Sequence, residues 1–322
     1  MNAPADAIAW LERFCGPLGG ANARELGGGV SNVVTLVEAP GLRAVVKQSL
    51  GKLRVEKEWH SDRGRIFREA AAMRFMAGRI KGGRVPNVLA EDPESFAIAM
   101  EAAPSEAEMW KARLFRGEFS EQPARAAGEM LASMISRTWR DAEAERPFGD
   151  TTVFEQLRVD PYYRFTAERR PEAREYIERL IACSAARRVS LTHGDWSPKN
   201  LLVGCGETWA IDWEVIHFGD PSFDAGFLIN HLLLKSIARP EWKREFAHLA
   251  EVFMDSLRAG LPAEGAWIAK GALQHLPALL LARVDGKSPV EYLDDSARER
   301  TRALALDLMR HPAGSITEVF AR

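Results

Sequence analysis

Two short polar motifs at a fixed interval constrain this chain more than any other feature of its sequence. The segment 193–200 reads HGDWSPKN, and the segment 212–214 reads DWE. Between them, an apolar run at 201–203 and a glycine-containing turn at 204–206 predict a strand and a reversal, and the run at 209–211 predicts the returning strand. The spacing therefore predicts a loop and a hairpin that bring both motifs to one site.

The side chains of these motifs suit phosphoryl transfer. Asp195 can accept a proton from a hydroxyl group, and Asn200 and Asp212 offer the hard oxygen ligands that Mg²⁺ prefers. Phosphoryl transfer needs little more from protein side chains than positioning, charge neutralisation by a metal and a base for the nucleophile. Two alternatives stay open at this level. One is a set of turn-forming polar residues, and the other is a metal hydrolase that adds His193 and His217 to the two aspartates.

HGDWSPKN followed by IDWE resembles the motifs of the aminoglycoside phosphotransferase and choline kinase group, which has the protein-kinase-like fold. The resemblance implies that Asp195 is the catalytic base and that Asn200 and Asp212 bind the metal ions. Glu214 matches the second acid of the IDxE motif and is a further metal-binding candidate. Asp224 stands where members of the group have a residue that supports the catalytic loop from below.

The residue composition and the hydrophobic spacing of the chain change near residue 103, and this change predicts two lobes. β-branched runs at 30–37 and 42–48 predict a hairpin, and a helical pattern follows at 64–79. Later segments are rich in Ala, Glu and Arg with helical spacing. We therefore expect an α+β, bilobal protein-kinase-like fold, with a β-rich nucleotide-binding lobe at 1–103 and a mainly helical catalytic and acceptor-binding lobe at 104–322.

The first lobe has a pattern that is typical of nucleotide binding. Consecutive glycines at 27–29 let the backbone approach phosphate groups. In the fold that the resemblance implies, backbone groups near Glu101 and Ala103 contact the adenine. A lysine and a glutamate, which are considered next, complete the predicted ATP site. Its residues are Gly27, Gly28, Gly29, Ser31, Asn32, Lys47, Glu69, Glu101 and Ala103.

Lys47 is the predicted phosphate-binding lysine. It ends a strand pattern, as the corresponding lysine of kinases does. The resemblance implies an ion pair between Lys47 and a glutamate of the next helix, which is best matched by Glu69. Glu56 and Glu58 are the alternatives, although both fall before the predicted helix.

Further matches resemble methylthioribose kinases. They are GGGVSN at 27–32, the segment that starts at Lys47 and FGDPSFDAG at 218–226. Adjacent arginines grip the sugar in those kinases, whereas only Arg283 stands at the nearest place here. The predicted acceptor is therefore a small hydroxylated molecule, preferably sugar-like, with methylthioribose as one candidate. The residues predicted to shape its pocket are Trp196, Trp213, Arg283 and Asp285.

Other sequence features limit the partners and the location. A net charge of -2 argues against general nucleic-acid binding. No uncharged apolar stretch reaches the roughly 18 residues that a membrane span needs. The three cysteines are far apart and form neither a disulfide framework nor a metal pair, which favours a reducing cytoplasm. ATP and Mg²⁺ are the expected cofactors, and the oligomeric state is left open.

Three other functions are available to the same fold. A catalytically silent nucleotide-binding or scaffold protein would usually lack the base or a metal ligand, and this chain has both. A protein kinase would have HRD in place of HGD and a recognisable Ala-Pro-Glu segment after Asp212. An aminoglycoside phosphotransferase would have a strongly acidic pocket, whereas Arg283 and Lys287 are basic.

Overall fold

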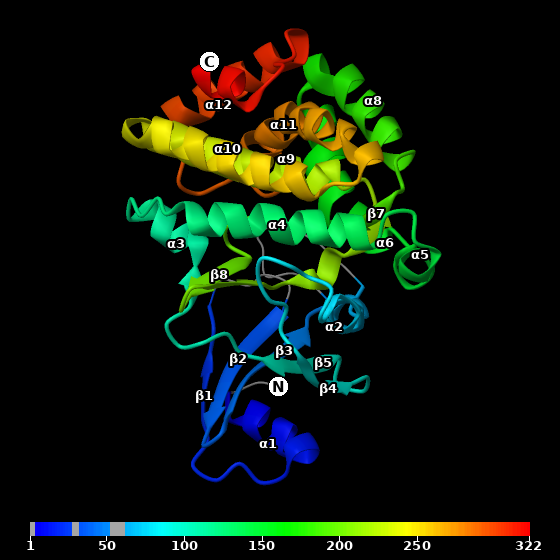
Figure 1. The fold of residues 1–322 in the computed structure, drawn as a ribbon, viewed down its shortest axis with the longest axis vertical. Coiled ribbons are helices and arrows are strands. Elements are labelled where there is room, and N and C mark those ends of the chain that lie inside the picture. Colours follow the sequence, from blue (N-terminus) through cyan, green and yellow to red (C-terminus); the bar gives the residue numbers. More distant parts are fainter. Residues whose placement is uncertain (1–3, 28–31, 52–61) are drawn as a thin grey trace.

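The computed structural model of the chain describes residues 4–27, 32–51 and 62–322. Figure 1 shows a sheet-containing region formed by the first part of the chain and a mainly helical region formed by the rest. This arrangement confirms the predicted α+β fold class. Among the described residues, no helix is both long enough and apolar enough to cross a membrane.

The sheet of the first region has five antiparallel strands in the order β1-β2-β3-β5-β4. The predicted hairpin is confirmed, because β2 pairs with β3 along its whole length and Gly41 turns the chain at a φ of 77°. The elements of this region are α1 (Pro4–Cys15), β1 (Asn22–Glu25), β2 (Asn32–Ala39), β3 (Leu42–Ser49), α2 (Arg65–Met76), β4 (Val88–Asp92) and β5 (Ala97–Glu101).

The alternation of side chains along β3 decides which helix each of them meets. Ala44 and Val46 belong to the apolar cluster that α1 forms with one face of the sheet. Val45 packs against the cluster that includes α2 on the other face. Since successive side chains of a strand point to opposite faces, Lys47 lies on the same face as Val45 and points toward α2.

The second region consists of helices and three short strand pairings. Its elements are β6 (Glu108–Met109), α3 (Trp110–Phe115), α4 (Glu121–Arg137), α5 (Ala142–Phe148), α6 (Thr152–Phe154), η1 (Glu155–Arg164), α7 (Phe165–Arg169), η2 (Pro171–Ala173), α8 (Arg174–Ala185), β7 (Ser190–Thr192), β8 (Leu201–Gly204), β9 (Glu207–Ala210), η3 (Trp213–Val215), β10 (His217–Gly219), α9 (Ser222–Ala238), η4 (Pro240–Trp242), α10 (Lys243–Gly260), η5 (Ala263–Gly265), α11 (Trp267–Asp285), α12 (Asp295–Arg310) and α13 (Ile316–Ala321).

Helix α9 forms the centre of the helical region. It is apolar nearly all round and is buried from Ser222 to Ser236, which is the pattern of a core helix rather than a surface helix. It packs against α10, α11 and α12. The first turn of α9 therefore has a fixed position beneath the strands that precede it.

The hairpin predicted between the two polar motifs is confirmed. β8 pairs with β9, with Leu201 opposite Ala210. The backbone N–H of Ile211 donates to the carbonyl of Asn200 at 3.0 Å, which extends the pairing to the ends of both motifs. The segment that contains Asp195 and Asn200 is thereby held beside Asp212.

Candidate active site

Lys47 joins the two regions through carboxylates. Its Nζ lies 2.7 Å and 2.9 Å from the two oxygens of Glu69 on α2, and 2.9 Å from Oδ1 of Asp212. Lys47 and Glu69 are both buried. Burial alone would lower the pKa of Lys47, but the surrounding carboxylates raise it above its ordinary value, so the ammonium stays charged. The predicted pairing of Lys47 with Glu69 is present, and Glu56 and Glu58 lie outside the described residues.

Three acidic side chains lie together at this point. One carboxylate oxygen from each of Glu69, Asp212 and Glu214 lies within 4.8 Å of the others. Oε2 of Glu214 accepts hydrogen bonds from Asn32 Nδ2 at 2.9 Å and from Arg65 Nε at 3.1 Å. A compact set of carboxylate oxygens fits a hard cation such as Mg²⁺, which takes oxygen ligands.

Asp212 has a left-handed backbone conformation, with a φ of 67°. Such a conformation is uncommon for a residue other than glycine, and non-glycine residues in it cluster at functional sites. It places the Asp212 carboxylate at the turn between β9 and η3, next to Lys47.

Asp195 is buried and lies between two cations. Its Oδ2 is 3.0 Å from Nη2 of Arg158 and 2.9 Å from Nζ of Lys199. Burial would raise the pKa of Asp195, but the two cations lower it below its ordinary range, so the carboxylate is ionised. The side-chain amide of Asn200 donates to the backbone carbonyl of Asp195 at 2.9 Å and fixes the loop between them.

The loop that presents Asp195 is fixed from below by α9. Asp224 accepts the backbone N–H groups of His193 and Gly194 at 2.6 Å and 2.8 Å, which confirms its predicted supporting role. Gly194 has a φ of 77°, and a Cβ there would lie 2.7 Å from a methyl group of Val215. Only glycine fits this position without displacing its neighbour.

His193 holds the loop as a neutral imidazole. Its Nδ1 accepts the backbone N–H of Asp195 at 3.2 Å, and its Nε2 lies 3.2 Å from the carbonyl of Ile211. Burial lowers the pKa of His193 to about 4. A histidine that is neutral and fully engaged by backbone groups holds the loop in position.

The two tryptophans of the motifs pack beneath the loop. Trp196 and Trp213 are at most 1% exposed, and their rings lie 5.3 Å and 4.6 Å from the His193 ring. Neither lines the small cavity beside Asp195. Their position is that of a support for the catalytic loop.

Arg283 and Asp285 lie on α11 but in different surroundings. Arg283 lines the same small cavity as Asp195. The Asp285 carboxylate is held by Arg170 at 2.6 Å and by Arg302 at 2.9 Å. The structure therefore places Arg283 and Asp195 in one cavity lining, whereas the carboxylate of Asp285 joins α11 to the residue that follows α7 and to α12.

The other predicted nucleotide-binding residues are only partly described. Gly28, Gly29 and Ser31 lie outside the described residues, and Gly27 is exposed just after β1. The Glu101 side chain accepts a hydrogen bond from Asn87 at 2.7 Å, and its own backbone N–H donates to the carbonyl of Asn87 at 2.8 Å. Ala103 is buried just beyond β5.

Sequence reasoning missed two cations of the site. Lys199 lies inside the first motif, and its position four residues after Asp195 in a turn could have identified it. Arg158 has no such signal, because it lies far upstream on η1, a π-helix. Its guanidinium also donates to the carbonyls of Gly194 and Leu157 at 2.6 Å and 2.7 Å, which fixes its direction.

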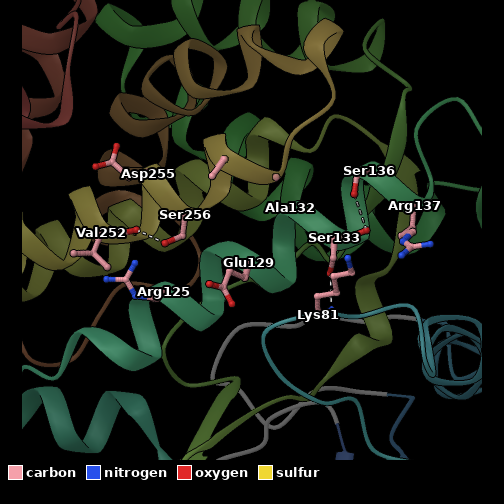
Figure 2. Close-up of a pocket in the computed structure, with 12 residues that line it drawn as sticks. Lys81, Arg125, Glu129, Ala132, Ser133, Ser136, Arg137, Val252, Asp255 and Ser256 are labelled. Atoms are coloured by element: carbon pink, nitrogen blue, oxygen red, sulfur yellow. Dashed lines mark hydrogen bonds between the residues drawn. The ribbon is translucent and has the colours of Figure 1, made fainter.

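A larger cavity lies elsewhere, between α4 and α10, and has a volume of about 570 Å³. Figure 2 shows its mixed lining, with Arg125 and Glu129 on the side of Val252 and Ser256, and Lys81 beside Ser133. None of the predicted site residues lines it. Asp195 and Arg283 line the smaller cavity instead.

Comparisons with known proteins identify a family that this sequence matches. The sequence model of the phosphotransferase enzyme family (APH) matches residues 22–261. A methylthioribose kinase from Yersinia enterocolitica serotype O:8 is 28% identical over 269 residues, which cover 73% of this chain and 66% of the kinase. The chain thus spans just under two thirds of the length of that relative.

Solved structures show the same fold at low identity. A choline/ethanolamine kinase family protein from Mesorhizobium loti superposes with a TM-score of 0.56 and 17% identity, covering 98% of this chain and 97% of that protein. A ternary complex of APH(2'')-IIa with streptomycin and ATP superposes with a TM-score of 0.54 and 14% identity, covering 96% and 99%. These likenesses confirm the predicted protein-kinase-like fold.

Proposed function

Because the chain belongs to the phosphotransferase enzyme family (APH), we propose that it is a small-molecule kinase. It transfers the γ-phosphate of ATP to a hydroxyl group of a small acceptor. The observation that supports this most directly is the ionised Asp195 carboxylate at a cavity beside the acidic motif, because a charged base and a metal-binding cluster are the parts that phosphoryl transfer needs.

Asp195 is the proposed base. The acceptor hydroxyl gives its proton to the Asp195 carboxylate as the oxygen attacks the γ-phosphorus, and the bond from that phosphorus to the β–γ bridging oxygen breaks to release ADP. Arg158 and Lys199 keep the carboxylate ionised before the transfer. A base that is already charged and aimed by its neighbours needs no reorganisation at the moment of reaction.

Asn200, Asp212 and Glu214 are the proposed ligands of Mg²⁺, which when bound supplies positive charge that neutralises the phosphates. Lys47 contacts the phosphates of ATP and is aimed by Glu69. The glycines at 27–29, with Ser31 and Asn32, cover the phosphates, and the chain around Glu101 and Ala103 contacts the adenine. These roles rest on the motif resemblance together with the contacts described above.

The acceptor is proposed to be a small hydroxylated molecule. The curated relative is a methylthioribose kinase, so methylthioribose is the first neutral acceptor to test. Choline and aminoglycosides come next, because the structural neighbours are described as a choline/ethanolamine kinase family protein and an aminoglycoside phosphotransferase.

The test is Mg²⁺-dependent ADP release with each acceptor, measured for the wild type and for Asp195→Asn. We expect the variant to lose at least 99% of turnover while MgATP still raises its melting temperature as in the wild type. Ordinary turnover in Asp195→Asn would refute the assignment of the base. ATP binding without ADP release for any acceptor would favour a silent nucleotide-binding protein.

A further inference from the structure

The small cavity beside Asp195, which we call the acceptor cavity, has an unusual balance of charge. Its volume is about 100 Å³, and it lies between α3, η1, α9 and α11 and the catalytic loop. The charged side chains that line it are Lys111, Lys199, Lys235, Arg283, Asp195 and Glu291. Four cations therefore face two carboxylates.

The two carboxylates are already matched by cations. Asp195 is paired with Lys199, and also with Arg158 from outside the lining. Glu291 is paired with Lys111 at 3.3 Å, near the surface. Lys235 and Arg283 are left over: within the described residues, neither has a carboxylate at ion-pair distance. When Lys235 is protonated, the cavity therefore has two more cations than carboxylates in its lining.

Lys235 is the more deeply placed of the two. It is 1% exposed, and its Nζ donates to the backbone carbonyl of His231 at 3.1 Å. Its other surroundings are the rings of Phe115 and Tyr292, each 5.6 Å from Nζ. Burial, together with the charges of Lys111 and Arg283, lowers the pKa of Lys235 to about 7. Burying an ammonium with so few partners is costly, and an anion beside it would remove that cost.

Arg283 is held by neutral groups. Its Nη1 donates to the Tyr162 hydroxyl at 3.1 Å, to the Ser288 hydroxyl at 2.9 Å and to the Ser288 backbone carbonyl. Its Nε has no hydrogen-bond partner, and neither has the Tyr292 hydroxyl. The cavity is therefore lined by a guanidinium that neutral groups hold in place and that has no carboxylate at ion-pair distance among the described residues, although Glu291 of the same lining acts on it at longer range.

Building on the proposed kinase function, we propose that the acceptor is a small hydroxylated molecule that also bears an anionic group, a carboxylate or a phosphate. The anion binds between Lys235 and Arg283, and the hydroxyl group lies at Asp195. A guanidinium and an ammonium in a dry site are the groups that bind oxyanions best. Neutral sugars leave both cations unpaired, and the polycationic aminoglycosides are repelled by them.

The size of the acceptor cavity further limits which acceptor molecules fit. A volume of about 100 Å³ is well below the roughly 300–1,000 Å³ that is usual for ligand pockets. The part of the acceptor inside the cavity is therefore small, and a hydroxy acid of three or four carbons is the simplest fit.

The test compares matched acceptors that differ in the anion. The pairs are D-glycerate with glycerol for the carboxylate arm and ribose 5-phosphate with ribose for the phosphate arm, with methylthioribose and choline alongside. Two measurements are made on each: the rise in melting temperature, and ADP release with MgATP. We expect at least one anion to raise the melting temperature more than its neutral partner and to give at least a tenfold higher kcat/KM.

The variants are Lys235→Met, Arg283→Gln and, as a matched control, Lys270→Met, whose side chain is exposed on the same helix as Arg283. We expect the first two to raise KM for the anionic acceptor at least tenfold and to leave KM for ATP unchanged, and the control to behave as the wild type. If Lys235→Met does not fold, the test uses Arg283→Gln alone, because Arg283 is only half-buried and its replacement should be tolerated.

The outcomes separate this inference from the proposed function. Preferential binding of an anion that needs Arg283, without ADP release, would refute the kinase assignment and support the anion site. ADP release with a neutral or cationic acceptor, with no preference for the anionic member of any pair, would refute the inference and leave the kinase assignment intact. An anion preference that survives Arg283→Gln and Lys235→Met would also refute it.

Discussion

Replacing Arg158 by methionine tests how the site keeps its base charged. In the wild type the guanidinium lies 3.0 Å from Oδ2 of Asp195, and both side chains are buried. Methionine has a similar length but no charge and no N–H donors. Asp195 then retains only Lys199 as a neighbouring cation, and the carbonyl of Gly194 loses its hydrogen bond from Nε of Arg158.

The magnitude follows from these contacts. Breaking a buried ion pair by removing one partner costs about 3–5 kcal/mol. Lys199, at 2.9 Å from the same oxygen, compensates part of the remaining charge, so we expect about 3 kcal/mol of lost unfolding free energy. That loss lowers the melting temperature by roughly 4–5 °C in a protein of this size. The acid limb of the rate profile moves to higher pH, because Arg158 is one of the cations that lower the pKa of Asp195.

The assay is a double-mutant cycle by urea unfolding. It uses Arg158→Met, Asp195→Asn, the double variant and the control Arg164→Met, whose half-exposed side chain on the same helix pairs with acids at the surface. We expect the control to change stability by less than about 1 kcal/mol. The double variant should lose about 1–3 kcal/mol less than the sum of the two single variants. Additivity within about 0.5 kcal/mol, with an unshifted rate profile, would show that Arg158 does not act through Asp195.

Three further predictions concern the surrounding groups. Lys47→Arg should lower kcat/KM for ATP at least tenfold in the ADP-release assay, because the larger guanidinium does not fit the buried space beside its carboxylates. Gly194→Ala should destabilise the fold by about 1–3 kcal/mol more than Gly206→Ala in urea unfolding, because both have positive φ but only Gly194 faces Val215; equal losses would contradict this. Burial raises the pKa of Asp224 from 3.8 to about 7, so the folded state holds a proton that the unfolded state releases between these values. The contribution of Asp224 to stability should then fall as pH rises from about 4 to about 7, and the stability of Asp224→Asn should vary less with pH over that range; equal slopes in the two proteins would contradict it.

Local patterns in the sequence were enough to predict the hairpin that joins the two motifs. The pairing of Lys47 with the following helix came from the resemblance, and the alternation of side chains along β3 explains it, since side-chain direction in a strand has a period of two. The contact of Asp224 with the loop came from the resemblance. These features depend on residues that are close in sequence or fixed by a motif.

The remaining features depend on packing between distant segments. Arg158 reaches Asp195 only because η1 lies beside the catalytic loop, and no local pattern encodes that contact. Asp285 stands two residues from Arg283, yet its carboxylate is taken by Arg170 and Arg302. On a helix, residues two apart point in different directions, so one of them could face the cavity and the other the neighbouring helices.

Because η1 has π-helical winding, the number of residues in this helix determines the direction in which Arg158 points. Its hydrogen bonds join residues five apart, so it accommodates more residues in each turn than an α-helix does. With the helical winding unchanged, deleting one residue between Glu155 and Arg158 would turn every following side chain by about a quarter of a circle relative to its start. The guanidinium of Arg158 would then swing away from Asp195 although no functional residue had been replaced. A relative with one residue fewer in this stretch would have to supply the cation beside its base from another position.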